Sequence, residues 1–211
     1  MKRYLFLFLL VISFLLTACN KEGSKEQNLE ALNDKEKMNY ISSVNITDRE
    51  SAILATTTSY ANVFEFNVED SYNKASVWIE KFVEGKPVEA RIGPMTKDIE
   101  EKGSIIFTTS SPPQKRNDII FEIGIHSLEG TSALHNIDTI PAKGLENISS
   151  MTDSISRVDV SDEEIVLASI CFSGDRGMSS LSPDFYKDMK HHMDELKRYE
   201  VVYVLKGKFL K

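Results

Sequence analysis

The sequence predicts a mainly β domain, a β-sandwich-like antiparallel fold with one C-terminal amphipathic helix. Short segments of alternating apolar and polar residues recur from residue 60 onward, and clusters of turn-forming residues separate them. Clear helical spacing occurs in one late segment, after Ser182, whereas residues 29–41 have a sparse helical pattern that indicates a frayed helix or a continued tether. An α+β arrangement of the same elements is the alternative. No internal repeat or shift of composition marks a further domain, so residues 42–211 are expected to form a single β-rich globular domain.

The start of this domain gives mixed signals. Thr47 and Glu50 have the spacing of a helix-capping box. The run that follows, residues 55–58, is poor in helix-forming residues. We therefore expect a strand from about Ala52.

The next segments predict the middle of the sandwich. Residues 60–68 alternate with period two, as a half-buried strand does. Residues 75–83 carry apolar side chains on both faces and predict a central strand. A tight turn with Gly85 at positive φ is expected to lead into a strand over 86–92. Residues 95–103 are interpreted as a charged connection.

The second half predicts four more strands and the helix. The strands are expected over 104–109, 118–127, 131–137 and 164–172, with a long irregular excursion over 138–161. Ser182, Pro183 and Asp184 form a helix-start signal. The helix is expected to end near Arg198 and to have one apolar face, which carries Phe185, Met189, Met193 (or His192) and Leu196. A last strand over 201–205 is expected to end in a turn at Gly207.

The amino-terminal stretch has the composition of an export signal. Lys2 and Arg3 precede an apolar run over residues 4–16, and small residues lead to Cys19. The run is shorter than the roughly 20 residues that span a bilayer core, which disfavours a permanent transmembrane anchor.

The tetrad Leu16-Thr17-Ala18-Cys19 resembles the lipobox of bacterial lipoproteins. The resemblance covers about the first tenth of the chain, and the domain after residue 41 is not assigned to any named family. The resemblance to the lipobox implies that residues 1–18 are a signal peptide, which is cleaved just before Cys19. It also implies that the Cys19 thiol carries a diacylglyceryl group. The polar residues after Cys19 predict a flexible tether over 19–41.

Charge and cysteine content narrow the partners. The chain of 211 residues has a formal net charge of −7; without Lys2 and Arg3 the basic count falls from 25 to 23 against 32 acidic residues, a net of −9. Nucleic acid is therefore not an expected partner, and membrane attachment is expected through the lipid on Cys19. Cys171, the other cysteine, lies in an apolar run and is interpreted as a buried, inert hydrophobe. An exported protein without an intramolecular disulfide is more typical of a Gram-positive-like cell than of a disulfide-rich periplasm. We therefore expect the protein at the extracytoplasmic face of a Gram-positive-like cell membrane.

Two groups of residues are candidates for a site. Asp188 with His192, and His191 with Glu195, are four apart, a spacing at which two side chains on one helix could share a cation. We favour the simpler interpretation that these are ordinary histidine–carboxylate pairs on a solvent-exposed helix and bind no cation. His126 and His135 are interpreted as surface histidines.

The loop over residues 173–177 carries Asp175, Arg176 and two glycines, which could form an anion nest. A plain turn between strand and helix is the favoured interpretation. Phosphate-loop, dinucleotide, nucleophile-elbow and zinc-protease motifs do not occur in the sequence. No catalytic residue, metal or cofactor is assigned.

The leading functional hypothesis is a lipid-anchored surface protein that binds or senses a ligand through its β domain. The alternative is an envelope-associated enzyme of hydrolase type, with a site assembled from residues far apart in sequence. A solute-binding component of an importer is disfavoured, because its two α/β lobes need more residues. A deep polar cleft with clustered ionisable groups would favour the enzyme, and a closed sandwich with shallow grooves would favour the binding module.

Overall fold

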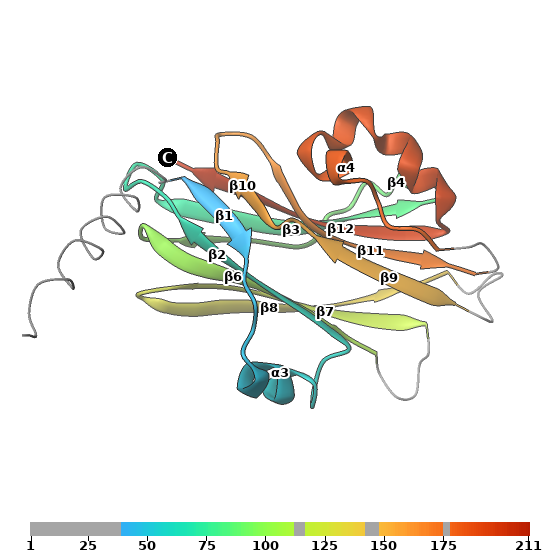
Figure 1. The fold of residues 1–211 in the computed structure, drawn as a ribbon, viewed down its shortest axis with the longest axis horizontal. Helices are drawn as coiled ribbons and strands as arrows, with labels where there is room; N and C mark the ends of the chain where they lie inside the picture. The colour runs from blue at the N-terminus through green and yellow to red at the C-terminus, as the bar shows by residue number, and fades with distance from the viewer. Residues whose placement is uncertain (1–38, 112–116, 142–147, 175–177) are drawn as a thin grey trace, which may run out of the picture. The chain divides into compact units, whose positions relative to one another are not determined.

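The computed structural model describes residues 39–111, 117–141, 148–174 and 178–211. Its strands form two antiparallel sheets packed face to face (Figure 1), which confirms the sandwich-like fold. The expected signal peptide over 1–18, Cys19 and nearly all of the tether lie outside the described residues.

Sheet A has the strand order β10-β1-β2-β6-β7-β8. Its strands are β1 (Tyr40–Ser43), β2 (Tyr60–Asn67), β6 (Lys102–Ser110), β7 (Asp118–Ser127), β8 (Gly130–Thr139) and β10 (Arg157–Asp159). Sheet B has the order β4-β3-β12-β11-β9, and β5 also pairs with β3. Its strands are β3 (Lys74–Val83), β4 (Lys86–Pro87), β5 (Ile92–Asp98), β9 (Ser149–Ser154), β11 (Ile165–Ser173) and β12 (Val201–Leu210).

The core lies between the sheets, where the period-two patterns direct every second side chain. A chain of aromatic rings runs through it from sheet A to sheet B. Phe107 stacks on Phe121 with ring centroids 6.1 Å apart, Phe121 lies 4.9 Å from Tyr203, and Phe172 meets Tyr203 edge-on. Phe107, Phe121 and Tyr203 are almost fully buried. These ring contacts therefore help to fix how the two sheets pack against each other.

Sheet B is covered on its outer face as well. The helical segment, residues 182–199, lies over it (Figure 1) and comprises α4 (Pro183–Lys187), η1 (Met189–His191) and η2 (Met193–Arg198). All nine residues of β11 are consequently buried, in keeping with its nearly continuous apolar sequence. Ser182 caps α4 by accepting a hydrogen bond from the Phe185 N–H, as expected.

The single helix expected after Ser182 is wrong in its continuity. Asp188 has φ −147° and ends α4, and the two turns that follow are 3₁₀ helices. The apolar face was nevertheless correctly assigned, since Phe185, Met189 and Leu196 are all buried against sheet B.

The structure corrects the prediction at the start of the domain. A helix, α3 (Asp48–Leu54), replaces the strand expected from Ala52, because both reciprocal bonds of the Thr47–Glu50 capping box form. Tyr40 and Ile41, which the sequence analysis placed in the tether, belong to β1. Ile41 is fully buried, paired with Phe66 on one side and Val158 on the other.

Other connections are also more ordered than expected. Most of the charged stretch 95–103 lies in β5 and β6, and the irregular excursion over 138–161 contains β9 and β10. The strand expected over 86–92 is limited to β4. Gly207 lies inside β12, which runs on to Leu210, rather than at a turn. Strands β4, β5, β9 and β10 are short or alternate weakly between apolar and polar residues, so no period-two pattern marks them in the sequence.

The turn after β3 has the predicted geometry. Gly85 has φ +74° and Glu84 has φ +48°, so both central residues are left-handed, as a two-residue hairpin turn requires. A Cβ on Gly85 would lie 2.6 Å from Lys197 Cγ, so the turn also depends on glycine for close packing against the helical segment.

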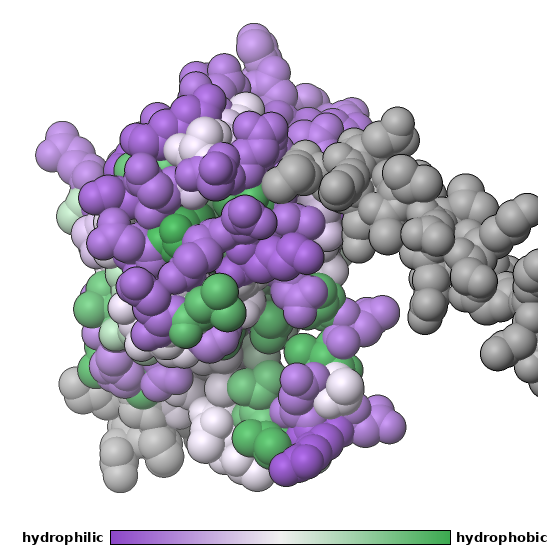
Figure 2. Space-filling model, turned by 90° about the vertical axis from the view of Figure 1, so that its left-hand side faces the viewer, coloured by the Kyte–Doolittle hydropathy of each residue, from purple (hydrophilic) through white to green (hydrophobic). Residues whose placement is uncertain are grey.

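The end of the domain seen in Figure 2 is mostly hydrophilic, with hydrophobic side chains scattered among polar ones. Among the described residues, no helix has the length and apolar character that a bilayer-spanning helix needs.

Candidate functional site

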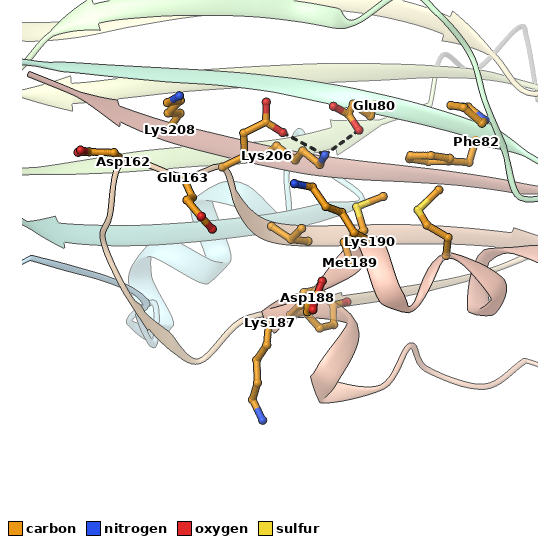
Figure 3. Close-up of a pocket in the computed structure, with 15 residues that line it drawn as sticks. Glu80, Phe82, Asp162, Glu163, Lys187, Asp188, Met189, Lys190, Lys206 and Lys208 are labelled. Atoms are coloured by element: carbon orange, nitrogen blue, oxygen red, sulfur yellow. Dashed lines mark hydrogen bonds and ion pairs between the residues drawn. The ribbon is translucent and has the colours of Figure 1, made fainter.

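A groove of about 800 Å3 lies between the outer face of sheet B and the helical segment (Figure 3). Strands β3, β11 and β12 contribute its floor, and η1 with the loop before β11 contributes its walls. Its charged lining residues are Glu80, Asp162, Glu163, Glu164, Lys187, Asp188, Lys190, Lys206 and Lys208. Its apolar lining residues are Phe82, Pro87, Val166, Met189 and Met193, with Tyr186 beside them.

The register of β3 and β12 places the charges on the floor. Tyr203 faces the core, so its β3 partner Lys81 faces inward and the neighbouring residue Glu80 faces outward. In the same register Lys206 lies opposite Trp78. The outward positions of two adjacent, otherwise apolar strands thus carry a carboxylate and an ammonium group.

These side chains form a closed ring of contacts. The Trp78 Nε1–H donates to Glu80 Oε1 at 3.1 Å, and Lys206 Nζ lies 2.9 Å from Glu80 Oε2 and 3.3 Å from Glu164 Oε2. Arg91 then pairs with Glu164 at 3.2 Å and stacks 4.2 Å from the Trp78 ring centroid. Each of the five side chains therefore has two neighbours within the ring.

The ring makes the floor rigid and balances its charge. Only 13% of the Lys206 side chain is exposed, and a charge at that depth is stable because two carboxylates surround it. Lys206 is therefore committed to the floor.

One end of the groove is formed by Asp162. Its carboxylate pairs with Lys211 at 3.2 Å and accepts a hydrogen bond from the Tyr72 hydroxyl at 3.2 Å. The bonds from Lys211 and Tyr72 lower the pKa of Asp162, so the carboxylate is ionised at neutral pH.

Three further charged side chains come from different parts of the groove: Lys190 from the helical wall, Lys208 from β12 and Glu163 from the loop before β11. Lys190 and Met189 extend from η1 towards the floor (Figure 3), and Phe82 lies at the other side of the groove. Lys190, Lys208 and Glu163 make no side-chain hydrogen bond or ion pair within the part of the chain that the structure describes. The groove thus combines two cations and an anion with an apolar seat of Phe82, Met189 and Met193.

The two histidine–carboxylate pairs that were considered as a shared cation site, Asp188 with His192 and His191 with Glu195, are not formed. His191 Nδ1 lies 2.6 Å from Asp188 Oδ2, and His192 Nδ1 lies 3.2 Å from Glu195 Oε1. The partners are three apart instead of four because the segment has 3₁₀ geometry, with three residues per turn. Within the described ranges, no group of three or more His, Cys, Asp or Glu side chains could hold a metal ion.

The histidines His126 and His135 lie apart from the groove. His126 and His135 are exposed on the outer face of sheet A, bonded to Thr131 and Glu122. Of the loop 173–177, the residues 175–177 lie outside the described residues.

Cys171 is 2% exposed and lies on the outer face of β11, beneath the helical segment. Its neighbour two residues away, Ser169, shares a 2.7 Å hydrogen bond with the Tyr186 hydroxyl. The low exposure of Cys171 confirms that it is a buried cysteine, and burial raises the pKa of its thiol to about 12.

Sequence reasoning missed the groove. Glu80 and Lys206 each interrupt an apolar strand, and that interruption was a usable signal because charges are rarely buried without a partner. Their pairing depends on the β3–β12 register, across more than 120 residues of sequence, which local patterns do not encode.

The fold and the groove define an antiparallel β-sandwich domain with a helical cover over one sheet. Within that class, the chain belongs to the YgaN domain family, whose model matches residues 40–209. The match extends from β1 to β12 and so assigns to a family the domain that the sequence analysis had left unassigned. No curated protein and no solved structure matches the chain.

Proposed function

We propose that this chain is a lipid-anchored extracytoplasmic protein that binds a peptide-like ligand in the groove on sheet B. The anchor is the diacylglyceryl group on Cys19, and the membrane is reached through that lipid. The observation that supports the anchor is the Leu16-Thr17-Ala18-Cys19 tetrad directly after the apolar run.

The observation that supports binding is that one groove holds two kinds of charged side chain. Some are paired with each other in the floor, and others make no side-chain hydrogen bond or ion pair among the described residues. The ring around Lys206 keeps the floor in place before any ligand arrives, which lowers the entropic cost of binding. Lys190, Lys208 and Glu163 then offer charges of both signs to a ligand.

A short zwitterionic peptide fits this chemistry. Its carboxylate meets Lys190 and Lys208, its ammonium group meets Glu163, and an apolar side chain rests on Phe82, Met189 and Met193. A purely anionic ligand would instead meet the surrounding carboxylates, which include Asp162 and Glu164. Apolar seats with a few placed polar groups are typical of ligand sites.

The test uses tripeptides with a central Leu, Phe or Tyr, together with the same peptides acetylated and amidated at their ends. Trp78 is the only tryptophan of the chain and belongs to the floor ring, so its fluorescence reports on the groove of the detergent-solubilised mature protein. We expect free tripeptides to change the fluorescence and blocked peptides to have little effect.

The matched variants are Lys190→Glu, in the groove, and Lys102→Glu, an exposed lysine on sheet A. We expect Lys190→Glu to weaken binding at least about tenfold, the equivalent of one lost charge contact, and Lys102→Glu to leave it unchanged. Equal affinity of free and blocked peptides, or of the two variants, contradicts the proposal.

A further inference from the structure

Strand β8 is a long free edge of sheet A. It pairs with β7 along all ten of its residues and with no other strand in the described part of the chain. The remaining edges are shorter or interrupted. Strand β10 has three residues, β9 has six, and the other edge of sheet B consists of β4 and β5, which carry Pro87, Pro94 and a register shift.

The β8 edge has one of the features by which proteins usually block edge-to-edge pairing, an inward-pointing charge at Asp138, and that charge is paired with Lys81. Its sequence, GTSALHNIDT, contains no lysine, arginine or proline, and its register with β7 has no bulge. The side chain of Ile137 is outward-facing and 60% exposed. The single charged residue, Asp138, points into the sandwich, where its carboxylate lies 2.6 Å from Lys81 Nζ.

The backbone groups that face away from β7 can be assigned. The β7–β8 hairpin closes at Ser127 and Gly130 across a two-residue loop, so even-numbered residues of β8 bond to β7 and odd-numbered residues face outward. Thr139 agrees with this, since its carbonyl accepts a hydrogen bond from Lys81 at 3.0 Å. Lys81 therefore closes one end of the edge, and the open groups belong to Thr131, Ala133, His135 and Ile137.

We propose that this edge pairs with the β8 edge of a second copy of the chain, antiparallel about a two-fold axis at Leu134. In that register all four open residues of each copy meet open residues of the other. Thr131 pairs with Ile137 of the second copy, and Ala133 pairs with its His135. A large exposed side chain lies beside a smaller one, no like charges face each other, and sheet A continues through both copies.

A second copy is the occupant that the observations favour. Two copies of one strand, paired antiparallel about a two-fold axis, present the same residues to each other. An edge whose open residues carry no Asp, Glu, Lys or Arg therefore matches itself. A different protein would need a strand of matching length, and its charges would find no opposite charge on the β8 edge.

The test is cross-linking of the full chain, purified in mild detergent, with a short bismaleimide. The double variant Thr131→Cys/Ile137→Cys places a thiol on each side of the expected contact. The control variant Glu65→Cys/Ser51→Cys places thiols at exposed positions away from β8. We expect a covalent dimer from the first variant at least about tenfold more abundant than from the control.

Two further substitutions separate pairing from folding. Ala133→Pro removes an N–H that faces away from β7, so the hairpin keeps its bonds while the edge loses one. Ala133→Lys adds a charge at the same exposed position, and both substitutions are made in the Thr131→Cys/Ile137→Cys background. Each should abolish the cross-linked dimer without lowering the unfolding midpoint by more than a few degrees. A chain that stays monomeric, cross-links no more than the control, or links only to a different protein overturns the proposal.

Discussion

Lys81 Nζ lies 2.6 Å from Asp138 Oδ2, and this ion pair joins sheet B to sheet A inside the sandwich. The Tyr203 hydroxyl donates a hydrogen bond to the same carboxylate oxygen at 2.7 Å. Burial and the adjacent carboxylate raise the pKa of Tyr203, so its phenol stays protonated and remains a donor. The Lys81 and Asp138 side chains are 11% and 25% exposed, which places the pair near the margin of the core.

We predict that Lys81→Met lowers the free energy of unfolding by about 2–3 kcal/mol, somewhat below the range for a fully buried pair because part of the Asp138 side chain is exposed. The loss arises because Asp138 is left without its cation. Urea unfolding provides the measurement, and Lys74→Met, at an exposed pair, is the control. The double variant Lys81→Met/Asp138→Leu should recover much of the loss; a double variant as unstable as the single one would contradict this explanation.

Glu195 should make the helical segment sensitive to acid. Burial opposes its ionisation, but bonds from the Ser182 N–H at 2.8 Å, the Ser182 hydroxyl at 2.5 Å and Arg198 at 2.8 Å outweigh that effect and lower its pKa. A lowered pKa stabilises the fold above the unfolded-state value, and this contribution is lost as the pH falls through the folded-state value. Wild type should therefore lose more stability than Glu195→Gln between about pH 5 and pH 3. Parallel stability curves for the two proteins would show that Glu195 has no such role.

Cys171 should react slowly in the native protein. Its thiol is buried, and its pKa is raised to about 12, so very little thiolate exists at pH 8. We expect a polar disulfide reagent to modify it roughly a thousandfold more slowly in native buffer than in denaturant. The change in absorbance of the reagent measures both rates. Fast modification in native buffer would indicate that the helical segment opens readily above β11.

Lipidation predicts a specific pattern of membrane release. Cys19→Ser should abolish fatty-acid labelling of the full chain, because the lipid is attached through the Cys19 thiol. The wild-type protein should stay with membranes in high salt and leave them in detergent, since attached acyl chains hold it there rather than charge. Labelling of the Cys19→Ser protein, or release of wild type by salt alone, is the opposing result.

The strands with strong period-two patterns could be predicted from the sequence, because the alternation of buried and exposed side chains marks where each strand begins and ends. Strands β2, β7 and β11 were placed within a residue or two of their observed bounds. The short strands β1, β9 and β10 could not, since their few residues carry too few apolar side chains to form a period-two pattern. The helix α3 was missed for a different reason. A local cap at Thr47 outweighed the poor helix propensity of the residues that follow.

The groove required information that no local pattern holds. Its floor depends on Glu80, Lys206 and Glu164 meeting across three strands, and its wall depends on the break at Asp188 that turns one helix into three short ones. Hydrophobic spacing correctly predicted which side chains of the helical segment are buried, such as Phe185 and Leu196. It gave no indication that Lys190 would face the floor.

The passage from β9 to β10 links an edge strand of sheet B to an edge strand of sheet A through only Ile155 and Ser156. The Ile155 N–H donates to Leu167 O in sheet B, and Ser156 O accepts from the Ser43 N–H in sheet A. Local unfolding of one edge strand therefore breaks contacts of the other edge strand. We expect the two sheets to unfold in one cooperative step. Strand β1 has only four residues, yet it is connected in this way to β11, whose residues are all buried. We therefore expect its backbone amides to be protected from hydrogen exchange to a similar degree as those of β11.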